Sequence, residues 1–190
     1  VTTKQPAYDE ATKTYTVNRG SELAWLAAAV NGTLETRAVE ADSFAGKTFV
    51  LTQDIDLGNE PWTPIGNATA SFQGTFDGNG KTIANLVVNG YNTNAGLFGF
   101  TTNGEIKNVT IENAKVSGRL NVGVVAGTPY TSKYTNITVQ GHVEVNGMAY
   151  VGGVGGKNAY TNWNNIKVEV DETSYVRANS VENGIAYRTY

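Results

Sequence analysis

The chain of 190 residues contains no cysteine, one histidine and one methionine, and only 16% of its residues are charged. Without cysteine it can form neither disulfide bonds nor cysteine-ligated zinc sites. A single histidine, His142, gives little support to a Ser-His-Asp triad or a multi-histidine metal centre. The 14 basic residues do not cluster, which argues against a nucleic-acid interface. We therefore expect no cofactor, no bound metal and no nucleic-acid partner.

Long hydrophobic runs are also missing. No stretch of about 18 apolar residues is present, so no membrane span is expected in this chain. The chain begins at Val1 without an initiator methionine or a basic-then-apolar leader, which favours a mature or trimmed piece of something longer, with any export signal or lipid anchor outside it. Its length favours a single domain over residues 1–190. The abundant glycine, 22 residues, favours turns and strands over helices.

One stretch, FDGNGKTI at 76–83, resembles a phosphate-binding loop at first sight. Such a loop needs a helix to begin at its lysine, because the helix N-terminus and backbone N–H groups hold the phosphates. Here Lys81 is followed instead by an apolar run with strand spacing. We interpret Asp77–Gly80 as a turn between two strands.

Two sequence patterns recur along the chain. The first is an asparagine followed by an apolar–x–apolar strand, and its four copies begin at Asn85, Asn108, Asn136 and Asn165. The second is a glycine-rich segment, seen at 95–99, 123–127 and 152–156. A period of about 28 residues with short strands and no helical spacing is typical of a parallel β-solenoid.

Equivalent residues of a solenoid stack about 4.8 Å apart in successive coils. The four repeated asparagines should therefore form a structural ladder, each amide bonding to its copies above and below. Two inward-facing apolar columns are also predicted: Leu86, Val109, Ile137 and Ile166, and Val88, Ile111, Val139 and Val168.

Residues 21–32 predict a helix, with Ser21 as its N-cap and Asn31-Gly32 at its end. Its apolar stripe consists of Leu23, Leu26, Ala27 and Val30. Because an open solenoid end would recruit other strands, we interpret this helix as a cap. The predicted organisation is a strand and capping helix at 15–43, repeat coils at 44–170 and an irregular segment at 171–190.

The segments 44–57, 62–66, 72–83, 96–99 (GLFG) and 106–109 resemble bacterial proteins that carry the GLUG motif. The best match is GLFG, whereas 123–127 and 152–156 are looser copies. The resemblance covers roughly residues 15–170. It implies a right-handed parallel β-helix in exported, often surface-attached proteins of Gram-negative bacteria, many of them described as adhesins. It supplies no catalytic residues.

Parallel β-helices also house polysaccharide lyases and hydrolases, so carboxylate pairs need attention. Glu112 and Glu169 would lie two coils apart, roughly 9.6 Å, near the upper limit for an inverting glycosidase. Outward glutamates of an exposed strand are more often simply solvated. Asp54, Asp56 and Asp77 could gather as calcium ligands, but turn formation explains them better.

Aromatic residues mark two loops, 128–135 and 157–164. Tyr134 and Trp163 are 29 residues apart and should stack at one edge, with Tyr130 and Tyr160 nearby. Such a row of flat amphipathic rings suits sugars or protein partners. The alternative is an aromatic ladder that only stabilises the fold.

The repeat pattern predicts an all-β parallel β-helix that serves as a non-catalytic, monomeric module. The resemblance adds that the helix is right-handed and that the module lies outside the cell or on its outer surface. Its expected role is adhesion, or binding of a glycan or a host protein, within a larger protein. Two alternatives stay open: a polysaccharide lyase or hydrolase, and an inert stalk.

Overall fold

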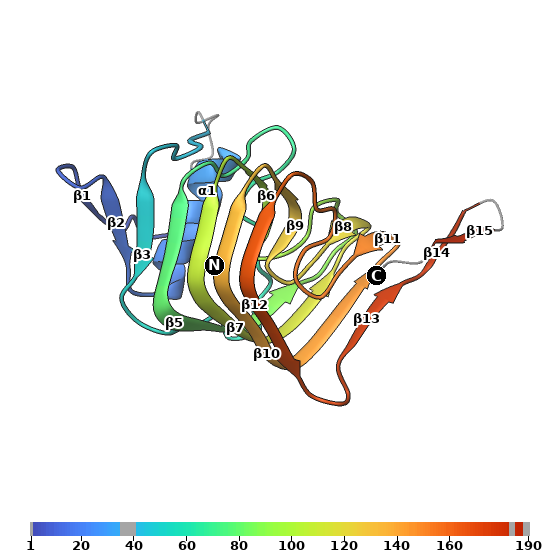
Figure 1. Cartoon of the computed structure of the whole chain (residues 1–190). Coiled ribbons are helices and arrows are strands. Elements are labelled where there is room, and N and C mark those ends of the chain that lie inside the picture. Colours follow the sequence, from blue (N-terminus) through green and yellow to red (C-terminus); the bar gives the residue numbers. More distant parts are fainter. Residues whose placement is uncertain (1, 35–40, 183–184, 188–190) are drawn as a thin grey trace.

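The computed structural model describes residues 2–34, 41–182 and 185–187. These residues form an all-β parallel solenoid of about five turns with a single short helix (Figure 1). The elements in chain order are β1 (Ala7–Asp9), β2 (Thr14–Val17), α1 (Gly20–Asn31), β3 (Thr48–Leu51), β4 (Ile55–Asp56), β5 (Thr75–Val88), β6 (Phe98–Thr102), β7 (Glu105–Ser117), β8 (Leu120–Val122), β9 (Ala126–Tyr130), β10 (Lys133–Gly147), β11 (Ala149–Val151), β12 (Asn162–Val170), β13 (Tyr175–Ala178), β14 (Ser180–Glu182) and β15 (Ile185–Tyr187).

One long sheet runs the length of the molecule in the order β1-β2-β3-β5-β7-β10-β12, and its strands lie side by side in Figure 1. In this sheet all neighbours from β2 to β12 pair in parallel, whereas β1 pairs antiparallel with β2. Thr75 lies opposite Glu105, Glu105 opposite Lys133, and Lys133 opposite Asn162. The parallel repeat predicted from the sequence is therefore confirmed. The right-handed sense stays a prediction.

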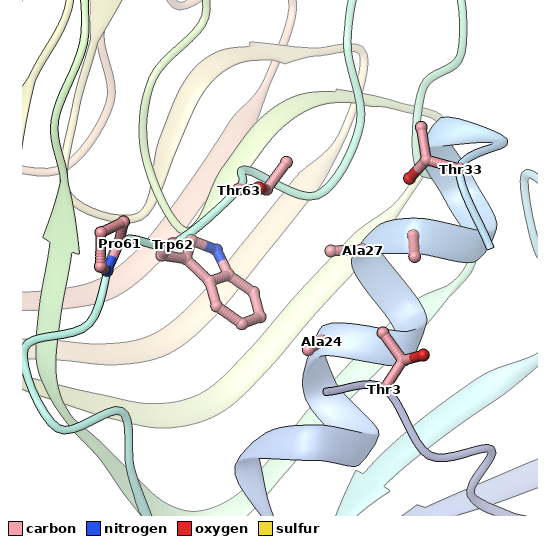
Figure 2. Close-up of a pocket in the computed structure, with 8 residues that line it drawn as sticks. Thr3, Ala24, Ala27, Thr33, Pro61, Trp62 and Thr63 are labelled. Carbon is pink, nitrogen blue, oxygen red and sulfur yellow. The ribbon is translucent and has the colours of Figure 1, made fainter. Parts of the chain in front are cut away.

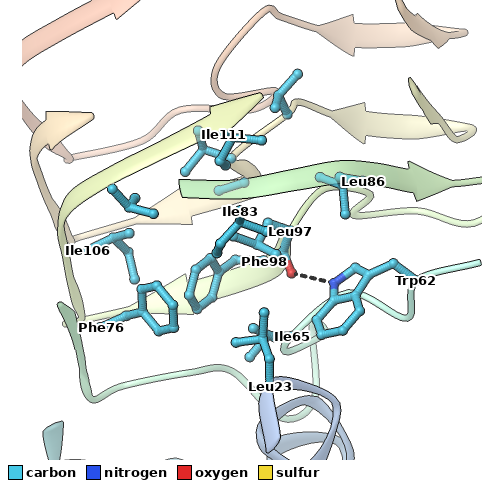
Figure 3. Packing of buried hydrophobic residues seen from close by; sticks show 14 of the residues in the cluster. Leu23, Trp62, Ile65, Phe76, Ile83, Leu86, Leu97, Phe98, Ile106 and Ile111 are labelled. Atoms are coloured by element: carbon cyan, nitrogen blue, oxygen red, sulfur yellow. Dashed lines mark hydrogen bonds between the residues drawn. The ribbon is translucent and has the colours of Figure 1, made fainter. Parts of the chain in front are cut away.

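The interior is filled by apolar side chains from every face of the coil, as Figure 3 shows around Ile83, Phe98 and Ile111. The second halves of the long strands form another face, and the pairs β6–β9 and β8–β11 complete the coil. Aromatic rings dominate the N-terminal half of the core, where Tyr15 stacks on Phe49 at 4.5 Å between ring centroids. Burial of this continuous core is the main stabilising contribution to the fold.

The register of the inward columns was predicted correctly from the second repeat onward, because Val109 pairs with Ile137 and Ile111 with Val139. Val168, the last member of the second column, is 51% exposed and was wrongly predicted to be covered. The first members were wrong. Leu86 lies opposite Ala114 and Val88 opposite Val116, one face further along the coil. The error arose because Asn85, which was aligned with Asn108, occupies a different corner.

The asparagine ladder exists for three of its four predicted members. Asn136 donates to Asn108 (3.1 Å), and Asn165 donates to Asn136 (2.7 Å). Asn108 in turn donates to Asp77 (3.2 Å), so a carboxylate begins the ladder. The three asparagines have φ angles of 54–56°. This left-handed conformation is one that asparagine tolerates better than other residues with a side chain, which explains its repetition at a sharp corner.

Asn85 was wrongly placed in that ladder. Its side chain donates to Asp56 at 2.9 Å, in the preceding coil, and it is also left-handed, with φ of 62°. It therefore marks the next corner of the coil, where the left-handed Asn113 follows in the same register. Both corners need a left-handed residue, and both use asparagine. The sequence pattern therefore could not show which corner a given asparagine occupies.

Helix α1 begins one residue before the predicted start. Arg19 occupies the N-cap position without a side-chain cap, so Ser21 is not the cap. Glu22 in the first turn instead holds the residues before the helix, because its carboxylate accepts the N–H of Asn18 (3.2 Å) and pairs with Arg19 (3.3 Å). The predicted end is confirmed, since Gly32 is left-handed with φ of 72°. The predicted apolar stripe is buried, and Leu23 points towards Ile65 in the core (Figure 3).

The segment 171–190 was predicted to be irregular, but it contains strand structure. Strand β13 pairs in parallel with β10, and β14 pairs antiparallel with β15. The segment lacks the repeated asparagine of the earlier coils, so the sequence offered no mark for β13. Among the described residues, no helix has the length and apolar character needed to span a membrane.

Candidate ligand-binding surface

Tyr134 does not lie on the surface, which corrects its assignment to a binding edge. It is fully buried, and its hydroxyl lies 2.6 Å from the hydroxyl of Thr101. Burial raises the pKa of Tyr134 above its ordinary value. Its ring stacks on Trp163 with 4.5 Å between centroids, as the 29-residue spacing predicted. These two rings form a structural ladder, the alternative that the sequence left open.

Tyr130 and Tyr160 are the exposed pair of the predicted edge. Tyr130 is 39% exposed and Tyr160 is 83% exposed. Their rings lie perpendicular, with centroids 5.9 Å apart. Tyr160 is held in a left-handed conformation with φ of 49°, and the N–H of Thr131 bonds to Ala159 at 3.0 Å. This geometry leaves Tyr160 available to a ligand.

Beside Tyr160 runs a shallow groove of about 480 Å³, here called the corner groove. It is lined by Gly46, Gln73, Gly74, Thr75, Asn103, Gly104, Glu105, Thr131, Ser132, Lys133, Tyr160 and Asn162. The strand register places these residues in three columns that cross successive coils. The groove therefore follows the long axis of the solenoid along one corner.

The middle column of the corner groove is a floor of small residues: Gly74, Gly104 and Ser132. A Cβ atom at Gly74 would meet the carbonyl oxygens of Phe44 at 2.7 Å and Lys47 at 2.9 Å. A side chain would thus force the coils apart. The floor carbonyls accept N–H groups of the next coil, such as Glu105 to Gly74 at 3.0 Å. Close packing of the coils therefore explains the glycine at position 74.

The walls of the corner groove are polar but nearly uncharged. Amides and hydroxyls come from Gln73, Asn103 and Thr131 on one side and from Thr75 and Asn162 on the other. The charged lining residues are one acid, Glu105, and one base, Lys133, in adjacent coils. Their charges cancel, and Lys107 also pairs with Glu105 at 3.8 Å. Such a surface suits a neutral, hydroxyl-rich ligand.

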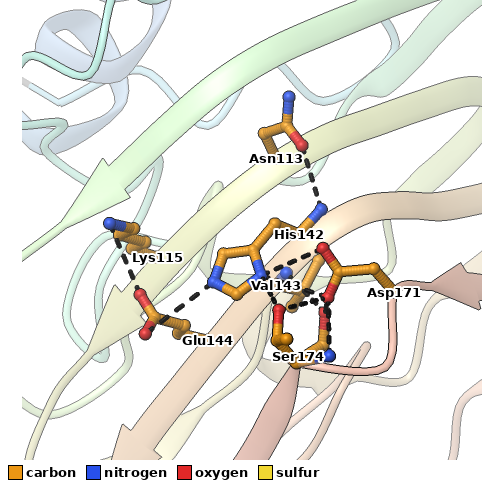
Figure 4. A network of polar contacts seen from close by, with 8 residues as sticks. Asn113, Lys115, His142, Val143, Glu144, Asp171 and Ser174 are labelled. Atoms are coloured by element: carbon orange, nitrogen blue, oxygen red, sulfur yellow. Dashed lines mark hydrogen bonds and ion pairs between the residues drawn. The ribbon is translucent and has the colours of Figure 1, made fainter.

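His142 belongs to a polar network at another corner (Figure 4). Its Nδ1 lies 3.1 Å from both carboxylate oxygens of Asp171, and its Nε2 lies 3.8 Å from Glu144. Hydrogen bonds from Thr173 and His142 lower the pKa of Asp171 to about 2. A hydrogen bond from Tyr175, with the charge of Lys115, lowers the pKa of Glu144. The network fixes the turn between β12 and β13.

The carboxylates considered as catalytic groups or calcium ligands accept hydrogen bonds from neighbouring residues. Glu112 accepts a hydrogen bond from Gln140 at 3.3 Å. Glu169 lies opposite Gln140 in the next coil, so the two acids are two coils apart with Gln140 between them. Asp54 accepts the backbone N–H of Thr82 (2.9 Å), and Asp56 accepts the backbone N–H of Gly58 and the side-chain amide of Asn85. The hydrogen bond from Asn85 also lowers the pKa of Asp56. In the described part of the chain, no three acidic or histidine side chains are arranged to hold a metal ion.

A second hollow, of about 250 Å³, lies between α1 and Trp62 (Figure 2). Small side chains, including Ala24 and Ala27 of the helix, face the indole across it. Trp62 is buried and donates its indole N–H to the carbonyl of Leu97 at 3.1 Å. The indole thus joins its loop to the segment around Leu97. We regard the corner groove, with its repeated polar walls, as the candidate site.

Three comparisons place this fold among known proteins. No protein-family model matches the chain. Halomucin of Haloquadratum walsbyi is 35% identical over 162 residues, which cover 78% of this chain but only 2% of halomucin. A solved structure of a candidate immunoglobulin A1 protease from Bacteroides ovatus matches with a TM-score of 0.52 at 19% identity, over 77% of this chain and 42% of that one. The structural match shows the fold alone.

The groove itself was not found from the sequence. The sequence does contain a feature that marks the groove. Gly74, Gly104 and Ser132 each come directly before the long strand of a coil. Recognising it needs the exact register, which the misplaced Asn85 obscured. Of the predicted binding residues, the structure brings Tyr160 to the groove, places Tyr130 beside it, and buries Tyr134.

Proposed function

We propose that this chain is a non-catalytic module of an exported, cell-surface protein and that it binds an extended, uncharged glycan in the corner groove. The observation that carries the proposal is that equivalent positions of successive coils line the groove, with small residues on its floor and mostly polar side chains on its walls. A polymer of similar units can make a similar contact with each coil. Tyr160 offers a flat ring at one end, against which a sugar face can stack.

The match to halomucin supports a place outside the cell, because that protein is named as a mucin. The proposal also includes the Gram-negative bacterial origin and adhesive role that the GLUG-like GLFG segment implies. An extended groove without an enclosed cavity suits adhesion, in which many weak contacts along a polymer add up.

Absence of catalysis is part of the proposal. The two candidate acids, Glu112 and Glu169, lie in the strand register beyond the corner groove, with Gln140 between them. His142 bonds Asp171 at a separate corner. Neither set lines the surface where the glycan would lie, so we expect oligosaccharides to be bound and released unchanged.

Calorimetric titration with neutral oligosaccharides of increasing length tests the proposal. We expect the affinity to rise with length until the groove is filled, and product analysis to find no cleavage. Tyr160→Ala should weaken binding by about tenfold, as loss of a contact anchor does. Tyr91→Ala is the matched control, because Tyr91 is also an exposed tyrosine (67%) but does not line the groove. Equal losses from both variants, or no binding by the parent protein, would refute the proposal.

A further inference from the structure

The lining of the corner groove forms straight rows along the solenoid. Thr75, Glu105 and Lys133 lie directly opposite one another in successive coils, without a register shift between them. The register shifts of these strand pairs come later in the strands, after Asp77 and after Gln140. Equivalent positions of the groove are therefore separated by the spacing of neighbouring strands, about 4.8 Å.

Each of these coils offers polar groups on both sides of the floor. In the first of them, Gln73 and Thr75 flank Gly74. The next two coils repeat this arrangement at residues 103–105 and 131–133. None of the six flanking residues is buried. A ligand that lies in the groove therefore meets hydrogen-bonding side chains along both of its edges in every coil.

The spacing of the rows restricts the shape of a polymer that can follow them. Contacts along a polymer add up only while its repeating units and those of the protein stay in phase. Neutral sugars joined by β-1,4 linkages form a flat, extended ribbon, and its rise per sugar is only slightly longer than the coil spacing. Successive rings of this ribbon are turned over, so both of its edges carry hydroxyl groups. Chains with α-1,4 or β-1,3 linkages curve into helices and would leave the row after a few contacts.

We propose that the glycan of the corner groove is a β-1,4-linked neutral polysaccharide in its extended ribbon form, which lies along the solenoid axis with one sugar per coil. The inference rests on the proposed function and adds the class of linkage to it. Both walls take part in binding, because alternate sugars turn the same hydroxyl groups towards opposite sides. The matching repeat makes the coil spacing itself the basis of selection.

Calorimetric titration with tetrasaccharides of different linkage tests the proposal. The β-1,4-linked probes are the tetrasaccharides of glucose, mannose, xylose and N-acetylglucosamine. The curved probes are maltotetraose and laminaritetraose, with α-1,4 and β-1,3 linkages. The best β-1,4-linked probe should bind about tenfold more tightly than either curved probe. Its affinity should rise at each step from the disaccharide to the tetrasaccharide, because each added sugar reaches a further coil.

Substitutions on the two walls test the orientation of the ribbon. Gln73→Ala removes an amide from one wall, and Thr75→Ala removes a hydroxyl from the other. Each should weaken binding of the best β-1,4-linked tetrasaccharide by about threefold to tenfold, the effect of losing one hydrogen bond. Gln140→Ala and Thr138→Ala are the matched controls, because these residues belong to the same sheet but do not line the groove. They should leave the affinity unchanged, and melting curves confirm that each variant is folded.

The possible failures of this inference and of the proposed function are distinguishable. Equal affinity for all linkages, or tighter binding of a curved probe, would overturn the inference and leave glycan binding in place. A loss of affinity confined to one wall would also overturn it. If no probe of either kind binds, both the inference and the proposed function are wrong.

Discussion

Removing the hydroxyl of Tyr134 distinguishes a structural ladder from a binding edge. In Tyr134→Phe the buried hydrogen bond to Thr101 is lost, while Thr101 keeps its bond from Ser132 (3.1 Å). The aromatic stack with Trp163 is retained. Loss of one such hydrogen bond lowers the free energy of unfolding by about 1 kcal/mol. For a chain of this size, that corresponds to a fall in Tm of about 2–4 °C.

Truncation to alanine removes the ring as well. Large aromatic-to-alanine changes in a core cost about 3–5 kcal/mol, so Tyr134→Ala should lower Tm by about 6–20 °C. Differential scanning calorimetry measures both variants, and titration with the oligosaccharide that binds the parent measures their affinity. We expect Tyr134→Phe to keep the parent affinity. Reduced affinity with an unchanged Tm would refute the assignment of Tyr134 to the core.

Three further predictions concern the coil architecture and are checked by unfolding measurements. Asn136→Ala should lower the free energy of unfolding in urea by about 1–3 kcal/mol, because it removes two ladder bonds and leaves alanine left-handed; an unchanged midpoint would contradict the ladder. Gly127→Ala should cost about 1–3 kcal/mol, since its Cβ would lie 2.6 Å from a carbonyl oxygen, whereas Gly153→Ala, with no atom closer than 3.8 Å, should cost much less. Asp171, whose pKa is lowered to about 2, stabilises the fold above its unfolded pKa of about 4 and loses that contribution as pH falls towards 2; Asp171→Asn should flatten the fall of Tm across this range.

Much of the fold could be predicted because each coil repeats the same local requirements. A left-handed corner favours asparagine, as at Asn108, Asn136 and Asn165, and this requirement appears directly in the sequence. The sequence shows less clearly where the solenoid ends and to which face of the coil a residue belongs. Asn85 satisfies the same requirement at another corner, so its pattern alone could not assign it to a face.

The candidate site was harder to predict, because it depends on which side chains the stacking brings together. Spacing correctly predicted that Tyr134 and Trp163 stack, but not that the stack lies inside the core. Tyr130 and Tyr160 differ from them by only a few positions and remain outside. The exposed end of β12 was also missed, because its valines have the same pattern as those of the covered coils.

The central claim is that the corner groove binds an extended neutral glycan, and an NMR titration of the backbone amides tests it most directly. Addition of a neutral oligosaccharide that the calorimetry identifies should shift the amide signals of Gly74, Gly104, Ser132 and Asn162, which come from four successive coils along the groove. Signals from α1 and from residues 166–170 of β12, which do not line the groove, should not move. Shifts confined to those other regions, with the groove signals unchanged, would contradict the account.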